Sequence, residues 1–270
     1  MKPTISVILP AYNAAPYIAQ AIDSILKQTF KDFELIIVDN CSTDKTWHII
    51  QSYVTKDNRI RAYQNDENLG VAGNRNQGIN LAEGKYVAWQ DADDISYPQR
   101  LEKQYHFMEA NPKVGIVGGF LQFFDETGYL SIRKYAPDDT NLRKTVFRYS
   151  PVALPATMIR KRCLDELGDY AVEHAPAEDL EMALRIGSRY QLANLQEVVL
   201  DYRQTPHSVT FNSLKKMELE TLAVRKKYAQ DAAYSMTLFD RLYNGLHYIS
   251  IFIIPPTWKI KLFNWLRNSS

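Results

Sequence analysis

The first hundred residues alternate between short apolar runs and segments of helical periodicity, and this alternation restricts the folds open to the chain. Each apolar run has the length of a buried strand and ends in a polar loop. Strands are predicted at residues 4–9, 33–38, 60–63 and 86–90, and helices at 17–27, around 44–54 and at 71–82. Strands and helices that alternate at this spacing form right-handed βαβ units. The sequence therefore predicts an α/β fold, with a mainly parallel central sheet and flanking helices.

Polar and glycine residues predict the ends of two of these helices. Ser42 or Thr43 is placed to cap the second helix at its N-terminus. Gly84 follows the third helix and is placed to end it.

Beyond residue 97 the alternation becomes less regular. Helices are predicted at 98–111, 161–167 and 179–190, and strands at 114–124, 152–159 and 198–202. A boundary is predicted near Asn212, where a helical tail rich in lysine and tyrosine begins. The chain is thus divided into a domain of residues 1–211 and a helical appendage of residues 212–270.

Composition excludes several classes of protein. The formal charge of +1 does not provide the basic surface that nucleic acid needs. Two cysteines, Cys41 and Cys163, cannot form a disulfide framework, which fits a reducing compartment. The N-terminus enters a strand without the apolar region of a signal peptide, and no apolar run is long enough to span a membrane. These features predict a cytoplasmic protein.

Three carboxylates follow the strand predicted at 86–90. Asp91 and Asp93 would point the same way if the backbone stays extended, and Asp94 follows directly. Like charges held so close repel each other, and a hard divalent cation with oxygen ligands would offset this repulsion. The alternative is a solvated turn that caps the helix starting near Pro98.

The loops after the first, second and fourth strands lie at one edge of a parallel sheet. They carry Ala11-Tyr12-Asn13, Asp39-Asn40 and Asp91-Ala92-Asp93. A nucleotide would bind at that edge. No glycine-rich dinucleotide motif and no Walker lysine motif is present, so a dehydrogenase and a P-loop kinase are disfavoured.

Four segments together resemble the family 2 inverting glycosyltransferases. They are Val7-Ile8-Leu9-Pro10-Ala11-Tyr12-Asn13, Ile37-Val38-Asp39-Asn40-Cys41-Ser42-Thr43-Asp44, Asn68-Leu69-Gly70 through Arg75-Asn76, and Asp91-Ala92-Asp93-Asp94. The order and spacing match over most of residues 4–210. The resemblance implies a GT-A fold, a nucleotide-diphosphate sugar donor and an Mg²⁺ or Mn²⁺ cofactor. It also implies a nucleotide-binding half at 1–97 and an acceptor-side half at 98–211.

The resemblance assigns the first two loops to the nucleoside. Pro10, Ala11 and Tyr12 would line the pocket, with Tyr12 beside the base, and Asn13 belongs to the same loop. Asp39 would accept a hydrogen bond from the uracil N–H, which suits a carboxylate. The alternatives are loop packing for Tyr12 and a helix cap for Asp39.

The resemblance assigns the next two motifs to the nucleotide and the metal. Arg75 would approach the base or the diphosphate, where a guanidinium offsets phosphate charge; the alternative is a surface charge on a helix. Asp91 would lie near the ribose, and Ala92 is a further predicted nucleotide-binding residue. Asp93, together with Asp91, would hold the metal that bridges the diphosphate.

Glu178-Asp179 resembles the family's Glu-Asp motif at a helix N-terminus, and Asp179 matches its general base. Inversion requires a carboxylate that takes the acceptor's hydroxyl proton during direct displacement. The alternative is a favourable interaction of both carboxylates with the helix dipole.

The segment from Asp201 to Ser208 resembles a Tyr-Arg-x-His-Pro-x-Ser stretch of non-processive members, with one departure. Thr205 stands at the histidine position and His207 lies two residues later. Arg203 keeps its place, so Arg203 and His207 are the predicted diphosphate-binding residues. The Gln-x-x-Arg-Trp motif of processive members is absent from the sequence.

The last thirty residues hold no acidic residue but several basic ones. Trp258, Leu262 and Trp265 repeat at helical spacing beside lysines, which suits a helix lying in a membrane interface. Peripheral contact with an anionic membrane is therefore expected through residues 246–270. The alternative is a helix that packs on the catalytic domain, with its tryptophans in a core.

The combined prediction is a non-processive inverting transferase that moves one sugar from a UDP-sugar to a hydroxyl of a glycan or lipid-linked glycan. It would act in surface-polysaccharide synthesis at the cytoplasmic face of the inner membrane. Two alternatives remain: a metal-dependent nucleotidyltransferase, and a nucleotide-sugar-binding module with impaired catalysis.

Overall fold

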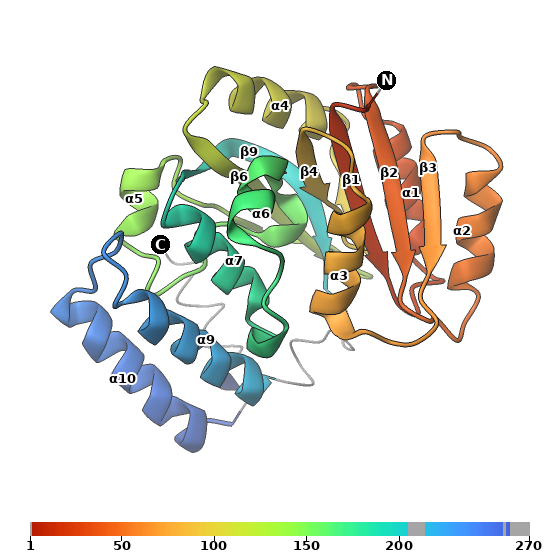
Figure 1. Cartoon of the computed structure of the whole chain (residues 1–270). Coiled ribbons are helices and arrows are strands. Elements are labelled where there is room, and N and C mark those ends of the chain that lie inside the picture. Colours follow the sequence, from red (N-terminus) through yellow and green to blue (C-terminus); the bar gives the residue numbers. More distant parts are fainter. Residues whose placement is uncertain (1, 205–213, 256–257, 260–270) are drawn as a thin grey trace.

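The computed structural model describes residues 2–204, 214–255 and 258–259, and within these residues nine strands form one sheet (Figure 1). The strands are β1 (Ile5–Ala11), β2 (Phe33–Asp39), β3 (Ile60–Gln64), β4 (Tyr86–Trp89), β5 (Ile95–Ser96), β6 (Val114–Asp125), β7 (Gly128–Arg133), β8 (Met158–Arg160) and β9 (Gln191–Arg203). Their order is β3-β2-β1-β4-β8-β6-β9-β5, with β7 paired to β6.

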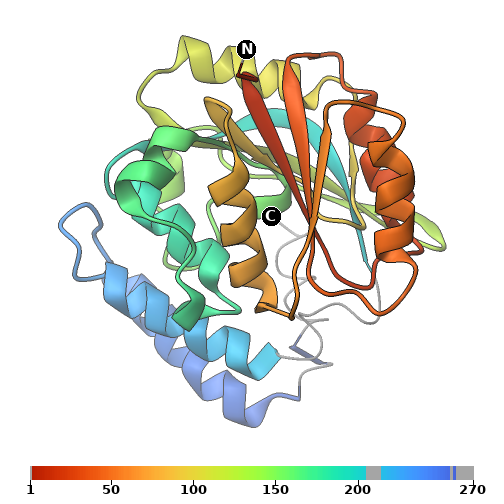
Figure 2. The ribbon, with the colours of Figure 1, turned by 45° about the vertical axis from the view of Figure 1, so that its right-hand side comes forward.

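Helices cover both faces of this sheet (Figures 1 and 2). They are α1 (Ile18–Leu26), α2 (Thr46–Val54), α3 (Gly70–Leu81), α4 (Arg100–Ala110), α5 (Asp139–Arg143), α6 (Lys161–Leu167), α7 (Glu178–Gly187), α9 (Leu214–Tyr228) and α10 (Leu238–Ile253), with short 3₁₀ turns at Leu154–Ala156 and Val172–His174. Apolar residues of α1, α2 and α4 pack on one face of the sheet. Those of α3, α6 and α7 pack on the other face.

The first half of the sheet is parallel, as the sequence predicts. β1 pairs in parallel with both β2 and β4, and β2 pairs in parallel with β3. Ala11 is the register partner of Asp39, and Ile8 is the partner of Trp89. Because these strands are parallel and their ends are aligned, the loops that follow β1, β2 and β4 all emerge at the carboxyl edge of the sheet.

The second half of the sheet is mixed. β8 is antiparallel to both β4 and β6, whereas β6 and β9 are parallel partners. The predicted strand at 152–159 is wrong in its first part, because a 3₁₀ turn occupies Leu154–Ala156 and the strand starts at Met158. The last strand begins at Gln191, seven residues before its predicted start, and it bends through register shifts against β6.

Two predicted helix ends are wrong. Ser42 and Thr43 do not cap α2; its first residue, Thr46, is held by the carboxylate of Asp44, whose Oδ1 accepts from the Thr46 N–H at 2.9 Å. Gly84 does not end α3, which stops at Leu81 with Ala82 already extended. Gly84 instead passes so close to β1 that a Cβ there would lie 2.6 Å from the Ser6 nitrogen.

Helix α3 lies unusually close to β1. A Cβ added to Gly78 would lie 2.4 Å from Cγ2 of Ile8, so only glycine allows this approach. The same helix carries Arg75, which is 6% exposed. The glycine thus sets the depth at which Arg75 lies.

The tail forms two helices: α9 lies beside α7, and α10 lies on the far side of α9 (Figure 1). Val224 and Tyr228 of α9 share a core cluster with Leu180 and Leu184 of α7. Helix α10 packs on α9, and 73% of Trp258 is exposed, so this tryptophan is not in a core. Among the described residues, none of the helices has both the length and the apolar character needed to cross a bilayer.

Candidate active site

The carboxylates after β4 differ in their exposure. Asp91 and Asp93 are partly exposed, whereas Asp94 is 1% exposed. One oxygen of Asp94 accepts from the Arg203 backbone N–H at 2.9 Å, and the other is buried without a partner among the described residues. Asp94 therefore joins the acid cluster to β9, and two carboxylates rather than three remain for a ligand.

The charge of these carboxylates is not balanced within the cluster. Burial raises the pKa of Asp93 to about 6, and the charge of Asp91 acts in the same direction. Burial, and then Asp93 and Asp91, raise the pKa of Asp94 well above its usual value. A cation beside Asp91 and Asp93 would stabilise their charged forms and so lower the raised pKa values.

The oxygen donors of Asp91 and Asp93 fit Mg²⁺ or Mn²⁺. In the described part of the chain, no group of three or more His, Cys, Asp and Glu side chains could hold a metal. An ion here would thus take its remaining ligands from water or from a bound diphosphate. This is the usual binding mode of Mg²⁺ at nucleotide sites.

Arg75 connects the acid cluster to the N-terminus of α7. Its Nη1 donates to Asp179 Oδ1 at 2.6 Å and to Glu178 Oε1 at 3.0 Å, and its Nη2 lies 3.8 Å from Asp91 Oδ1. Its guanidinium also lies over the rings of Trp89 and Tyr170, at 5.9 and 5.7 Å from their centroids. It is not a surface charge.

Asp179 lies in the first turn of α7 and has the chemistry of a base that works near neutral pH. Burial raises its pKa to about 7; Arg75 opposes this shift, while Glu178 and Asp91 add to it. Solvent reaches 43% of the side chain and works against the full shift, but the carboxylate remains accessible to an incoming hydroxyl group.

Asp39, at the end of β2, is fully buried and already accepts several hydrogen bonds. Its donors are the Ser42 N–H at 3.2 Å, the Ser42 hydroxyl and the Gln64 amide at 2.9 Å. It is not a helix cap. Its carboxylate fixes the loop between β2 and α2 through Ser42.

The residues predicted to line the nucleoside pocket are not equally available to a ligand. Ala11, at the end of β1, is 2% exposed and Ala92, after β4, is 8% exposed; both side chains belong to the core, so they can offer a ligand only backbone atoms. Tyr12 is 50% exposed. Asn13 Oδ1 accepts from the Thr43 N–H at 2.9 Å, and this contact ties the two loops together.

Arg203 lies beside the acid cluster. Its guanidinium is between the rings of Tyr17 and Phe124, at 4.7 and 4.4 Å from their centroids. It donates to the Asp93 carbonyl at 2.9 Å and to Gln20 at 2.7 Å. His207, the other predicted diphosphate ligand, lies outside the described residues.

Several residues that build this site were not among the predicted site residues. Ser42 and Gln64 hold Asp39, and Trp89 and Tyr170 flank Arg75. Two of them lie at a sequence signal: Ser42 is inside a matched motif, and Trp89 is in the strand predicted directly before Asp91. The contact between Arg75 and Asp179 joins residues 104 positions apart, and no local pattern indicates it.

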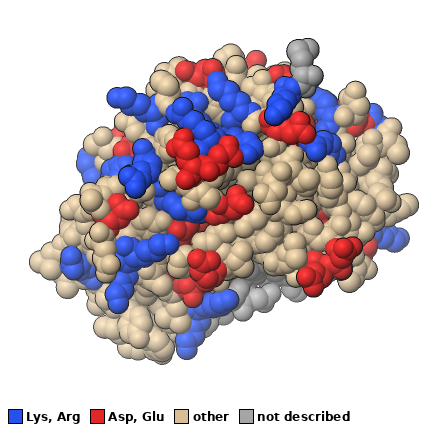
Figure 3. Space-filling model, in the orientation of Figure 1, with Lys and Arg blue, Asp and Glu red and all other residues tan. Residues whose placement is uncertain are grey.

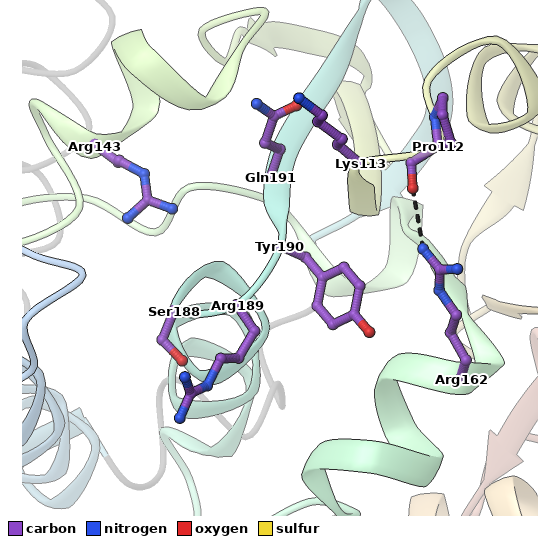
Figure 4. A pocket seen from close by; sticks show the side chains of 8 residues that line it. All are labelled: Pro112, Lys113, Arg143, Arg162, Ser188, Arg189, Tyr190 and Gln191. Carbon is purple, nitrogen blue, oxygen red and sulfur yellow. Dashed lines mark hydrogen bonds between the residues drawn. The ribbon is translucent and has the colours of Figure 1, made fainter.

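A cavity of about 390 Å³ includes none of these residues in its lining. It is lined by Pro112, Lys113, Arg143, Arg162, Ser188, Arg189, Tyr190 and Gln191 (Figure 4). Lys113 and Gln191 stand at the amino ends of β6 and β9, so the cavity is at the opposite edge of the sheet from Asp91. Arg143 pairs with Asp139 and Arg162 donates to the Pro112 carbonyl, so the cavity is not assigned to the donor.

A family model described as glycosyl transferase family 2 matches residues 6–168. The chain belongs to this family. A relative, an uncharacterized glycosyltransferase of Methanocaldococcus jannaschii, is 32% identical over 273 residues, which cover 97% of this chain and 92% of the relative. The putative teichuronic acid biosynthesis glycosyltransferase TuaG of Bacillus subtilis is 33% identical over 227 residues, or 79% of this chain and 84% of TuaG.

Two solved structures are similar in fold. S. aureus TarS 1–349 in complex with UDP-GlcNAc has a TM-score of 0.65 at 18% identity, covering 93% of this chain and 81% of that one. Mannosyltransferase PcManGT from Pyrobaculum calidifontis, in complex with GDP-Man and Mn²⁺, also has a TM-score of 0.65 at 18% identity, covering 98% and 81%. The predicted family and the GT-A fold with C-terminal helices are confirmed. The family 2 chain is a glycosyltransferase.

Proposed function

We propose that this glycosyltransferase moves one sugar, with inversion at the anomeric carbon, from a UDP-sugar to a hydroxyl of a glycan or lipid-linked glycan. It would act in cell-surface polysaccharide synthesis at the cytoplasmic face of a membrane, which it would touch through residues 246–270. The putative role of TuaG in teichuronic acid biosynthesis and the UDP-GlcNAc bound to TarS support this proposal.

The observation that carries the proposal is the position of Asp179. The Asp179 carboxylate, whose pKa is raised, pairs with Nη1 of Arg75. Asp91 lies near Nη2 of the same guanidinium. In a direct displacement, the acceptor oxygen attacks the anomeric carbon and its proton passes to Asp179. The bond from the anomeric carbon to the diphosphate oxygen breaks, and the diphosphate leaves with that electron pair.

Asp91 and Asp93 would hold Mg²⁺ or Mn²⁺, whose charge stabilises the departing diphosphate. The Mn²⁺ in the PcManGT structure supports a metal-dependent reaction. Arg203 and His207 would complete the diphosphate site. For Arg203 to reach a phosphate, its hydrogen bond to Gln20 has to be exchanged.

Pro10, Ala11, Tyr12, Asn13 and Ala92 would enclose the nucleoside, with Tyr12 free to stack on the base. Recognition of uracil by Asp39 requires the Ser42 hydroxyl or the Gln64 amide to give way, because Asp39 is fully buried. One fold neighbour binds a UDP-sugar and another binds a GDP-sugar, so both kinds of donor belong in the test.

Turnover of UDP- and GDP-sugars with Mn²⁺ tests the assignment of the base. Asp179→Asn removes the proton acceptor at nearly constant shape, and we expect the rate to fall by about 10²-fold or more. Glu173→Gln, which removes an exposed acid just before α7, is the control and should leave the rate unchanged. Equal rates for Asp179→Asn and the parent protein would exclude Asp179 as the base.

The same measurement addresses the alternatives. Family membership argues against a nucleotidyltransferase. A binding module with impaired catalysis would bind a nucleotide-sugar but turn over none of the donors, and Asp179→Asn would then change nothing.

A further inference from the structure

Helix α10 has its polar side inward and its apolar side outward. Asp240 is buried in an ion pair with Arg148, Asn244 donates to the Phe147 carbonyl, and His247 contacts Glu218 of α9. The opposite side is apolar and more than half exposed at every residue; it consists of Leu238, Phe239, Leu242, Leu246, Ile249, Phe252 and Ile253. We call this set the outer face of α10.

The outer face is continuous along the helix. Leu238, Leu242, Leu246, Ile249 and Ile253 follow one another at intervals of three or four residues, which keeps them in one stripe. A soluble helix normally turns such a stripe toward a core, so a long exposed stripe marks a binding surface.

The charge around the outer face is positive. Arg241 is exposed at its margin, and Lys215 Nζ lies 4.9 Å from the centroid of the Phe252 ring. Within the described residues, neither Arg241 nor Lys215 forms an ion pair. No acidic residue follows Asp240 in the sequence, and in Figure 3 the lower left, where α10 lies in Figure 1, shows mainly uncharged side chains with basic ones beside them.

We propose that the outer face of α10 lies on the surface of an anionic lipid bilayer. An apolar stripe of seven residues along a helix of 16 residues, with basic margins, suits the interface between headgroups and acyl chains. A second copy of this chain fits less well, because it would bring the same unpaired cations together without acidic partners. The contact thus begins at Leu238, eight residues before the segment expected from sequence.

The position of α10 gives this contact a consequence for the reaction. In both ribbon views α10 lies on the lower side of the molecule, toward which the carboxyl ends of β1, β2 and β3 also point (Figures 1 and 2). A bilayer under α10 would hold the catalytic edge near the lipid surface. This part of the inference rests on the proposed function, and it favours an acceptor anchored in lipid.

Co-sedimentation of the full chain with vesicles tests the contact without any sugar transfer. Vesicles of phosphatidylcholine alone are compared with vesicles of equal parts phosphatidylcholine and phosphatidylglycerol. We expect binding to the anionic vesicles, and a loss of about tenfold or more in partitioning when Leu242→Glu and Leu246→Glu are combined. Leu130→Glu, at an exposed leucine of β7, is the matched control and should bind as the parent does.

All variants change exposed residues, and their unfolding temperatures should match the parent. Binding that is lost only in the α10 variant supports the proposal. Absence of binding, equal binding by the α10 variant, or a solution dimer that this variant dissociates would each overturn it. Because no step requires turnover, a failure here leaves the assignment of Asp179 untouched.

Discussion

Arg75 pairs with Asp91 of the acid cluster and with both Glu178 and Asp179. Its guanidinium neutralises part of their charge and fixes the direction of Asp179. A negatively charged diphosphate that arrives at Asp91 would compete for the same guanidinium. Donor binding and the basicity of Asp179 are therefore expected to depend on each other.

The pH dependence of kcat/KM tests this coupling. Because Asp179 must be ionised to act as a base, activity should rise with pH through about 7 in the parent protein. Arg75 lowers the pKa of Asp179, so Arg75→Gln should move this rise to higher pH and reduce the maximum rate. Arg75→Lys keeps the charge and should shift the profile less. An unchanged profile in Arg75→Gln would contradict the coupling.

Cys41 has a backbone φ of 62°, in the left-handed region that side chains with a Cβ disfavour. Cys41→Gly removes this strain, and we expect it to stabilise the protein by about 1 kcal/mol. Cys41→Ala keeps the Cβ and serves as the control, with little or no gain expected. Chemical denaturation of the three proteins measures the difference, and equal gains for both variants would show that strain is not the cause.

At the scale of elements, the site depends on how closely α3 approaches β1. Gly78 allows this approach, and Arg75 lies one turn before it on the same helix. Any displacement of α3 would move Arg75 away from Asp179. The N-terminus of α7, held by α9 on its other side, supplies the second half of the contact.

Gly78→Ala should therefore destabilise the protein by about 1–3 kcal/mol and lower its activity, because the new Cβ meets Ile8. The matched control is Gly245→Ala on α10, where a Cβ meets nothing within 4 Å. That change should stabilise the helix by up to about 1 kcal/mol. Thermal unfolding of both variants shows whether each change raises or lowers the stability of the protein. A stabilising effect of Gly78→Ala would contradict the account of α3.

Elements with a strong local pattern could be predicted from the sequence. The apolar runs of β1, β2 and β4 and the helix at Lys161–Leu167 are recognisable because their side chains are buried or periodic. β9 was predicted to begin too late because Gln191–Glu197 mixes polar and apolar residues and pairs through a bent register. The two-residue β5 carries no sequence signal and forms because β9 offers a partner.

The candidate site was predictable in its motifs but not in its contacts. Asp91, Asp93 and Asp179 stand in recognisable motifs, and the fold brings them around Arg75. Three features depend on tertiary packing and have no local pattern in the sequence. Asp94 is buried, Asp39 is enclosed by Ser42 and Gln64, and α10 turns its apolar side outward.

For the molecule as a whole, two halves of one sheet supply the two halves of the proposed chemistry. The parallel half ends at Asp39, Asp91 and Asp93, which would hold the donor, and the second half contributes Asp179 beside them through α7. The sheet is continuous across β4 and β8, so both sets of residues are held at fixed positions relative to each other. Helix α9 packs beside α7, and the tail helices extend the molecule away from the sheet.

The central claim is that a cation at Asp91 and Asp93 binds the donor's diphosphate. Calorimetric titration of UDP and GDP, with Mn²⁺ and again with excess chelator, tests it on the parent protein and on the combined variant Asp91→Asn, Asp93→Asn. Asp125→Asn, which changes an exposed carboxylate at the turn between β6 and β7, is the control. We predict that binding of the preferred nucleotide needs both Mn²⁺ and the two carboxylates, and equal affinity in chelator and in the combined variant would contradict the account.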